Sequence, residues 1–154
     1  MTRFRALTSA DLDAVAAITL RCNRHYEDWA PAGWTPPTGD DESERTSWAD
    51  ILAGEEICGL LALDRSGRPV GVAVAEPRGE LRRLFVDLEA QRHGIGSELL
   101  RRIEAALGVE VAGLWAVDES PAIEFYEANG WHRDGRERWH ERLGLPLIGM
   151  SKRL

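Results

Sequence analysis

The segment that most constrains the fold is residues 81–100, which read LRRLFVDLEAQRHGIGSELL. An apolar run of strand type at 81–86 is followed by a short loop with two glycines, Gly94 and Gly96. An amphipathic helix is predicted over 94–107, because its apolar residues fall on one helical face, and Gly108 is expected to end it. A strand that runs through a glycine loop into such a helix indicates a mixed α/β fold.

The rest of the chain supplies further elements of both kinds. Apolar runs and alternation predict strands over residues 2–7, 57–63, 69–75, 109–117, 131–139 and 146–152. Capping patterns at 8–11, 41–44 and 120–121 predict three more helices. We therefore expect one domain spanning residues 1–154, with about seven strands and four helices. Two adjacent charges, Arg82 and Arg83, break the strand period at 81–86, and a β-bulge would explain that break.

Composition excludes several classes of function. The 154 residues are 44% hydrophobic and carry a formal net charge of −7, so a nucleic-acid partner is not expected. No stretch approaches the roughly 20 apolar residues of a membrane span, and the N-terminus has no apolar signal segment. The two cysteines, Cys22 and Cys58, form no CxxC pair, and no ligand spacing suggests a metal. We expect a cytoplasmic protein with reduced thiols and no metal.

The glycine loop has the chemistry of an anion site. The first turn of a helix presents free N–H groups and the positive end of the helix dipole, and glycines let phosphates approach the backbone. The Walker pattern is absent, and Leu99 stands where a dinucleotide fingerprint has its third glycine. From the glycines alone, a structural turn and a nucleotide site both stay open.

The whole segment closely resembles the central motif of the GNAT N-acetyltransferases, an apolar strand, then [QR]xxGx[GA], then a helix. The resemblance implies that acetyl-CoA is bound, with its pyrophosphate on the loop and its pantetheine arm paired with the end of the preceding strand. The implied loop residues are Gln91, Arg92, His93, Gly94, Ile95, Gly96 and Ser97, and the implied strand residues are Leu84, Phe85 and Val86.

A second match lies at residues 119–131, which resemble the family pattern NxxAxx[FL]YxxxG[FW], with Glu119 in place of the usual asparagine. By this resemblance Tyr126 is the acid that protonates the leaving thiolate, and Glu80 takes the proton of the amine. A backbone N–H near Phe85 or Val86 would stabilise the oxyanion. The family fold implies a mixed sheet splayed between its fourth and fifth strands, with acyl-CoA in the opening.

The acceptor is expected to be a primary amine of a small molecule or peptide. In the family, the region of residues 26–48 covers the acceptor pocket, and here it holds Trp29, Trp34, Trp48 and several carboxylates. Indole faces and carboxylates suit a cation, so Trp29, Trp34 and Asp41 are predicted to bind the acceptor, although tryptophans that merely pack the helices are the alternative. A non-catalytic acyl-CoA-binding module on the same fold is the rival function, and a homodimer stays open.

Overall fold

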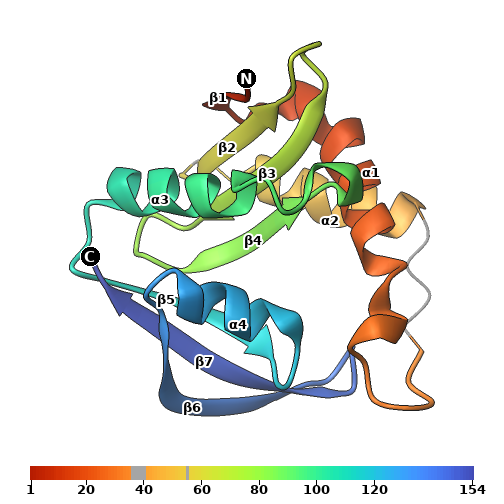
Figure 1. Cartoon of the computed structure of the whole chain (residues 1–154), viewed down its shortest axis with the longest axis vertical. Helices are drawn as coiled ribbons and strands as arrows, with labels where there is room; N and C mark the ends of the chain where they lie inside the picture. Colours follow the sequence, from red (N-terminus) through yellow and green to blue (C-terminus); the bar gives the residue numbers. More distant parts are fainter. Residues whose placement is uncertain (36–40, 55) are drawn as a thin grey trace.

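The computed structural model describes residues 1–35, 41–54 and 56–154 (Figure 1). Within these residues there are four α-helices and seven strands, as the sequence predicts. The helices are α1 (Leu12–Asn23), α2 (Asp41–Leu52), α3 (Ile95–Leu107) and α4 (Pro121–Ala128). The strands are β1 (Arg3–Ala6), β2 (Cys58–Leu63), β3 (Pro69–Ala75), β4 (Leu81–Val86), β5 (Val111–Val117), β6 (His132–His140) and β7 (Leu145–Arg153).

The strands form two sheets that divide between β4 and β5. The first has the order β1-β2-β3-β4 and the second the order β5-β7-β6, and all the paired strands are antiparallel. Among the described residues, one parallel bridge between Glu80 and Gly113 joins the start of β4 to β5. Beyond that bridge the two strands part, which confirms the splay predicted between the fourth and fifth strands.

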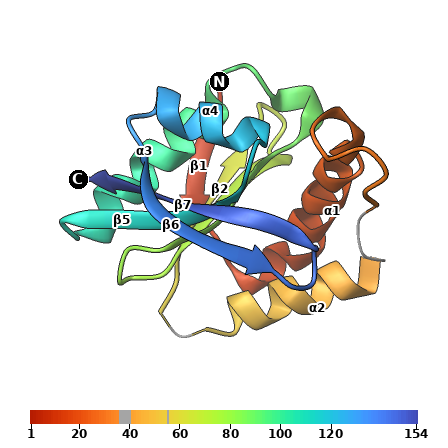
Figure 2. The same ribbon diagram turned by 90° about the horizontal axis from the view of Figure 1, so that it is seen from below.

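Helices cover both faces of the first sheet. Trp48 of α2 and Val15 of α1 pack with Leu61 and Val72 on one face, while Leu99 and Ile103 of α3 belong to the larger core that α3 and both sheets enclose. Figure 2 shows α1 and α2 together on one side of the molecule and α3 with α4 on the other.

The observed ends of the elements lie within a few residues of the predicted ones. The helix α3 ends at Gly108, whose φ of +63° is the left-handed conformation that glycine adopts at little cost. The predicted bulge is also confirmed, because Val74 pairs with Arg83 and Ala75 with Leu81, which leaves Arg82 as the extra residue. None of the helices in the described ranges has the length and apolar character needed to cross a membrane.

Candidate active site

The glycine loop runs from the end of β4 into α3 over a short 3₁₀ turn, Leu88–Ala90. Arg92 and Gly94 have φ values of +66° and +78°, and the left-handed turn at Gly94 starts the helix. The carbonyl of Gly94 accepts the first helical hydrogen bond, from Glu98 N–H at 3.0 Å, and no side chain caps the helix. The backbone N–H groups of Ile95, Gly96 and Ser97 at the first turn therefore remain available to a ligand.

The two glycines of the loop face different surroundings. A Cβ on Gly94 would meet no atom within 4 Å, whereas a Cβ on Gly96 would lie 3.3 Å from the ring of Phe125 in α4. Gly96 thus allows α3 and α4 to approach, and Gly94 leaves the space in front of the helix open. Four residues of the loop are exposed, namely Gln91, Arg92, His93 and Gly94. Ile95 is buried in the core, so only its backbone can contact a ligand.

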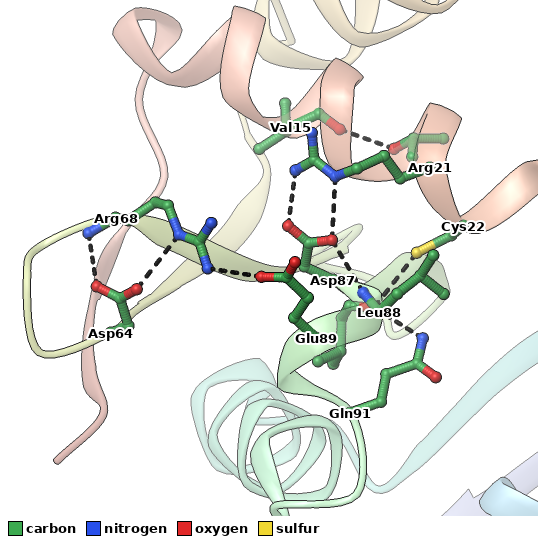
Figure 3. A network of polar contacts seen from close by, with 11 residues as sticks. Val15, Arg21, Cys22, Asp64, Arg68, Asp87, Leu88, Glu89 and Gln91 are labelled. Atoms are coloured by element: carbon green, nitrogen blue, oxygen red, sulfur yellow. Dashed lines mark hydrogen bonds and ion pairs between the residues drawn. The ribbon is translucent and has the colours of Figure 1, made fainter.

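Polar contacts fix the end of β4 against α1 and the loop (Figure 3). The carbonyl of Val86 accepts from Gln91 Nε2 at 2.9 Å and from the Cys22 thiol at 3.3 Å. Buried Asp87 forms an ion pair with Arg21 at 2.7 Å, and the Arg21 guanidinium lowers the pKa of the Asp87 carboxyl. The side chain of Gln91, a predicted cofactor residue, holds the strand end in place in this structure.

A cleft of about 1090 Å³ lies at the split, with residues of both β4 and β5 in its lining. Its walls come from β4, β5 and α4, from the start of α2 and the carboxyl end of α1, and from the turn between β6 and β7. Leu84 and Phe85 line it, and so do Trp29 and Trp34 from the segment after α1. Trp34 donates from Nε1 to the carbonyl of Leu143 at 2.8 Å, which ties that segment to the β6–β7 turn across the cleft.

Tyr126 lies in this cleft on α4. Its ring packs against Phe125 and Trp131, with centroids 5.2 and 5.9 Å away. Burial raises the pKa of the phenol, which therefore keeps its proton at neutral pH. Within the described part of the chain its hydroxyl has no hydrogen-bond partner, so it is available as a donor to a bound group.

Other predicted site residues lie apart from Tyr126. Glu80 pairs with Arg78 at 3.1 Å and lines a separate, smaller cavity of about 500 Å³. Trp48 is fully buried, with Nε1 donating to Thr19 Oγ1 at 2.9 Å, so it packs α2 on α1 and is no part of an acceptor lid. Asp41 begins α2, and its side chain lies outside the described structure, as does all of Asp40.

Sequence reasoning missed an ion pair in the cleft between Arg83 and Glu44 of α2. Their closest N–O distance is 3.5 Å, and Arg83 Nη2 also donates to Ser47 Oγ at 2.5 Å. The guanidinium lies 4.9 Å from the centroid of Trp48. Burial lowers the pKa of Arg83 and Glu44 raises it, while Arg82 and Arg142 lower it further. The broken strand period at Arg82 was the available signal, because the extra residue turns Arg83 toward α2.

Glu119, the departure from the family pattern, has a φ of +62° just before α4. Asparagine tolerates the left-handed conformation better than glutamate does. We expect Glu119→Asn to raise the free energy of unfolding by up to about 1 kcal/mol, measured by urea or thermal unfolding. Glu127→Asn, at an exposed position within α4, is the control and should bring no gain; equal effects of the two would contradict the strain argument.

Three features of the fold and site together characterise one class of protein. The two sheets part after β4, a glycine loop begins a helix at the split, and a tyrosine lies in the cleft. Comparisons with known proteins agree. The model of the acetyltransferase (GNAT) domain matches residues 41–154, so the chain belongs to the GNAT acetyltransferase family.

Relatives and solved structures are consistent with this assignment. A protein of Mycobacterium tuberculosis named as a probable N-acetyltransferase is 27% identical, over 99% of this chain and 92% of its own. A GCN5-related N-acetyltransferase from Rhodopseudomonas palustris superposes with a TM-score of 0.79 at 21% identity, over 100% of this chain and 96% of the other. The PaiA N-acetyltransferase of Thermoplasma acidophilum, solved with coenzyme A, gives 0.76 at 17% identity, over 100% and 99%.

Proposed function

We propose that this protein transfers an acetyl group from acetyl-CoA directly to a primary amine of a small molecule or peptide. The observation that carries the proposal is the arrangement around the split. The free N–H groups of the glycine loop lie at the end of β4, and Tyr126 lies beside the same strand in the cleft. A ligand that reaches from the loop along β4 would therefore bring its far end to Tyr126.

The loop suits the pyrophosphate of CoA. The N–H groups at the start of α3 would donate to its oxygens, and the open space before Gly94 would accommodate them. Exposed Arg92 and His93 are proposed to add charge or hydrogen bonds there. The outer edge of β4 has no partner strand beyond Glu80 among the described residues, and we propose that it pairs with the pantetheine arm at Leu84 and Val86.

The strand geometry favours Val86 as the oxyanion donor. Asp87 N–H donates to Val70 of β3 at 2.8 Å, and backbone groups alternate in direction along a strand. The N–H of Val86 therefore points away from β3, into the split, as its carbonyl does. One such donor is worth about 3 kcal/mol in a transition state of this kind.

In the proposed reaction, the amine nitrogen bonds to the acetyl carbon and the carbon–sulfur bond breaks. Tyr126 gives its proton to the departing thiolate, and a base takes the proton that the amine loses. Glu80 stays the predicted base. Because it lies outside the cleft and is paired with Arg78, it would have to act through water.

Acetyl-CoA binding and thiol release test this function together. We expect acetyl-CoA to raise the melting temperature, ATP not to compete with it, and a panel of primary amines to release free CoA thiol with formation of the acetylated amine. Binding of acetyl-CoA without thiol release from any amine would favour the non-catalytic module. Displacement by ATP would favour a nucleotide site.

A further inference from the structure

The charged residues of the cleft differ from those that the sequence suggested. Among the described residues that line it, four are arginines and two are glutamates, namely Arg24, Arg82, Arg83, Arg142, Glu42 and Glu44. Arg82 is paired outside the cleft with Glu76 at 2.6 Å. Among the residues whose side chains the structure describes, which include neither Glu27 nor Asp41, no carboxylate forms an ion pair with Arg24 or Arg142. The described lining therefore carries positive charge in excess of negative charge.

Arg83 is held in place before any ligand arrives. Trp48 lies under its guanidinium, Ser47 accepts from Nη2, and the bulge at Arg82 points it toward α2. Its side chain is 23% exposed and that of Glu44 is 16% exposed. A guanidinium already fixed by packing, one hydrogen bond and the ion pair with Glu44 loses little further entropy when it binds an oxyanion.

Two polar atoms of this pair have no hydrogen bond. Arg83 Nη1 and Glu44 Oε2 are both buried and face each other as an ion pair at 3.5 Å, a contact too long and too poorly aligned to be a good hydrogen bond, and neither atom has another hydrogen-bond partner. A buried charged group without its hydrogen bonds is costly, so ligand atoms that supply them would bind strongly. A ligand carboxylate would give Nη1 a shorter charged hydrogen bond than Glu44 does, and a ligand N–H would do the same for Oε2.

We propose that the acceptor carries an acidic group, a carboxylate in the first instance, in addition to the amine that is acetylated. Arg83 binds that carboxylate, and Arg142 adds to the positive field. The acceptor is thus of the amino-acid class and is not a purely cationic polyamine. Trp29 and Trp34 would lie beside the rest of the acceptor molecule. This inference rests on the proposed acetyl transfer and specifies its acceptor.

The test compares each amino acid with its own carboxamide, which keeps the amine and removes the negative charge. Acceptor KM and kcat are measured at saturating acetyl-CoA for free amino acids, their amides, phosphoethanolamine and spermidine. We expect the amide of the preferred acceptor to lose about 10- to 100-fold in kcat/KM, as a charged hydrogen bond predicts. In Arg83→Gln that discrimination should nearly vanish, while acetyl-CoA affinity is unchanged.

Arg45→Gln is the matched control. Arg45 is next to Glu44 on α2, pairs with Asp13 at 3.0 Å and does not line the cleft, so the discrimination should persist. If Arg83→Gln does not fold, as judged by circular dichroism, Arg142→Gln on the β6–β7 turn replaces it and should reduce the discrimination at least severalfold.

The outcomes separate the two proposals. Preference for spermidine or for the amides, or discrimination that survives in Arg83→Gln, overturns the acidic acceptor and leaves acetyl transfer standing. Preference for phosphoethanolamine would keep the oxyanion site but replace the carboxylate by a phosphate. If no amine is acetylated, calorimetric titration of the same amino acids and amides still tests the binding site. The wild-type protein should bind the amino acids more tightly than their amides, and Arg83→Gln should not.

Discussion

Tyr126→Phe is expected to lower kcat by about 10²- to 10⁴-fold, because it removes the proton donor to the thiolate while the ring still packs against Phe125 and Trp131. Acetyl-CoA affinity, measured by calorimetry, should hardly change. Because burial raises the pKa of this phenol, loss of the acid should not limit wild-type kcat below about pH 10, the ordinary pKa of tyrosine.

A Tyr126→Phe enzyme that turns over at nearly the wild-type rate would mean that water protonates the thiolate. An equal loss in acetyl-CoA affinity and in kcat would instead assign Tyr126 to binding. Either result would leave the fold and the glycine loop as they are described.

Gly94→Glu is expected to weaken acetyl-CoA binding by about 10²- to 10³-fold. The new carboxylate would stand in the open space before α3, where a pyrophosphate would lie, and two like charges about 4 Å apart repel by about 4 kcal/mol near a protein surface. Gly96→Glu is a poorer probe, since its Cβ would also press on Phe125.

Gly135→Glu provides the control for backbone strain and added charge. Gly135 has a φ of +86° against +78° for Gly94, and a Cβ at either position meets no atom within 4 Å. Both variants should lose similar stability in urea, and Gly135→Glu alone should keep wild-type acetyl-CoA affinity. Equal affinities in the two variants would remove the loop from the CoA site.

The sequence predicted most of the fold because its signals are local. Capping residues, glycines after helices and apolar periods mark the elements, and Gly108 and the 120–121 pair did so to within a residue. Even the bulge left a local trace in two adjacent charges. The splay between β4 and β5 came from family resemblance, since no local pattern encodes the parting of two strands.

The composition of the cleft could not be predicted in the same way. Glu44 and Arg83 meet across 39 residues of sequence, and only the packing of α2 against the sheet brings them together. The carboxylates counted in the sequence suggested a cation site, but the sequence does not tell which of them face the cleft. For the same reason the sequence left two interpretations of its tryptophans open, and Trp48 follows the packing alternative.

The extra residue in β4 has a consequence for how this enzyme could change its acceptor. Because side chains alternate along a strand, a bulge sets which side of the sheet receives each residue after it. Leu84 and Val86 pack toward α3, whereas Arg83 and Phe85 face α1 and α2. Under the proposed function, the backbone of Leu84 and Val86 would pair with the pantetheine arm while the side chain of Arg83 would contact the acceptor, although Leu84 and Phe85 both line the cleft. On this proposal, substitution at position 83 would alter acceptor preference without removing the backbone contacts to acetyl-CoA, whereas deletion of Arg82 would reverse the side of the sheet that one part of β4 faces.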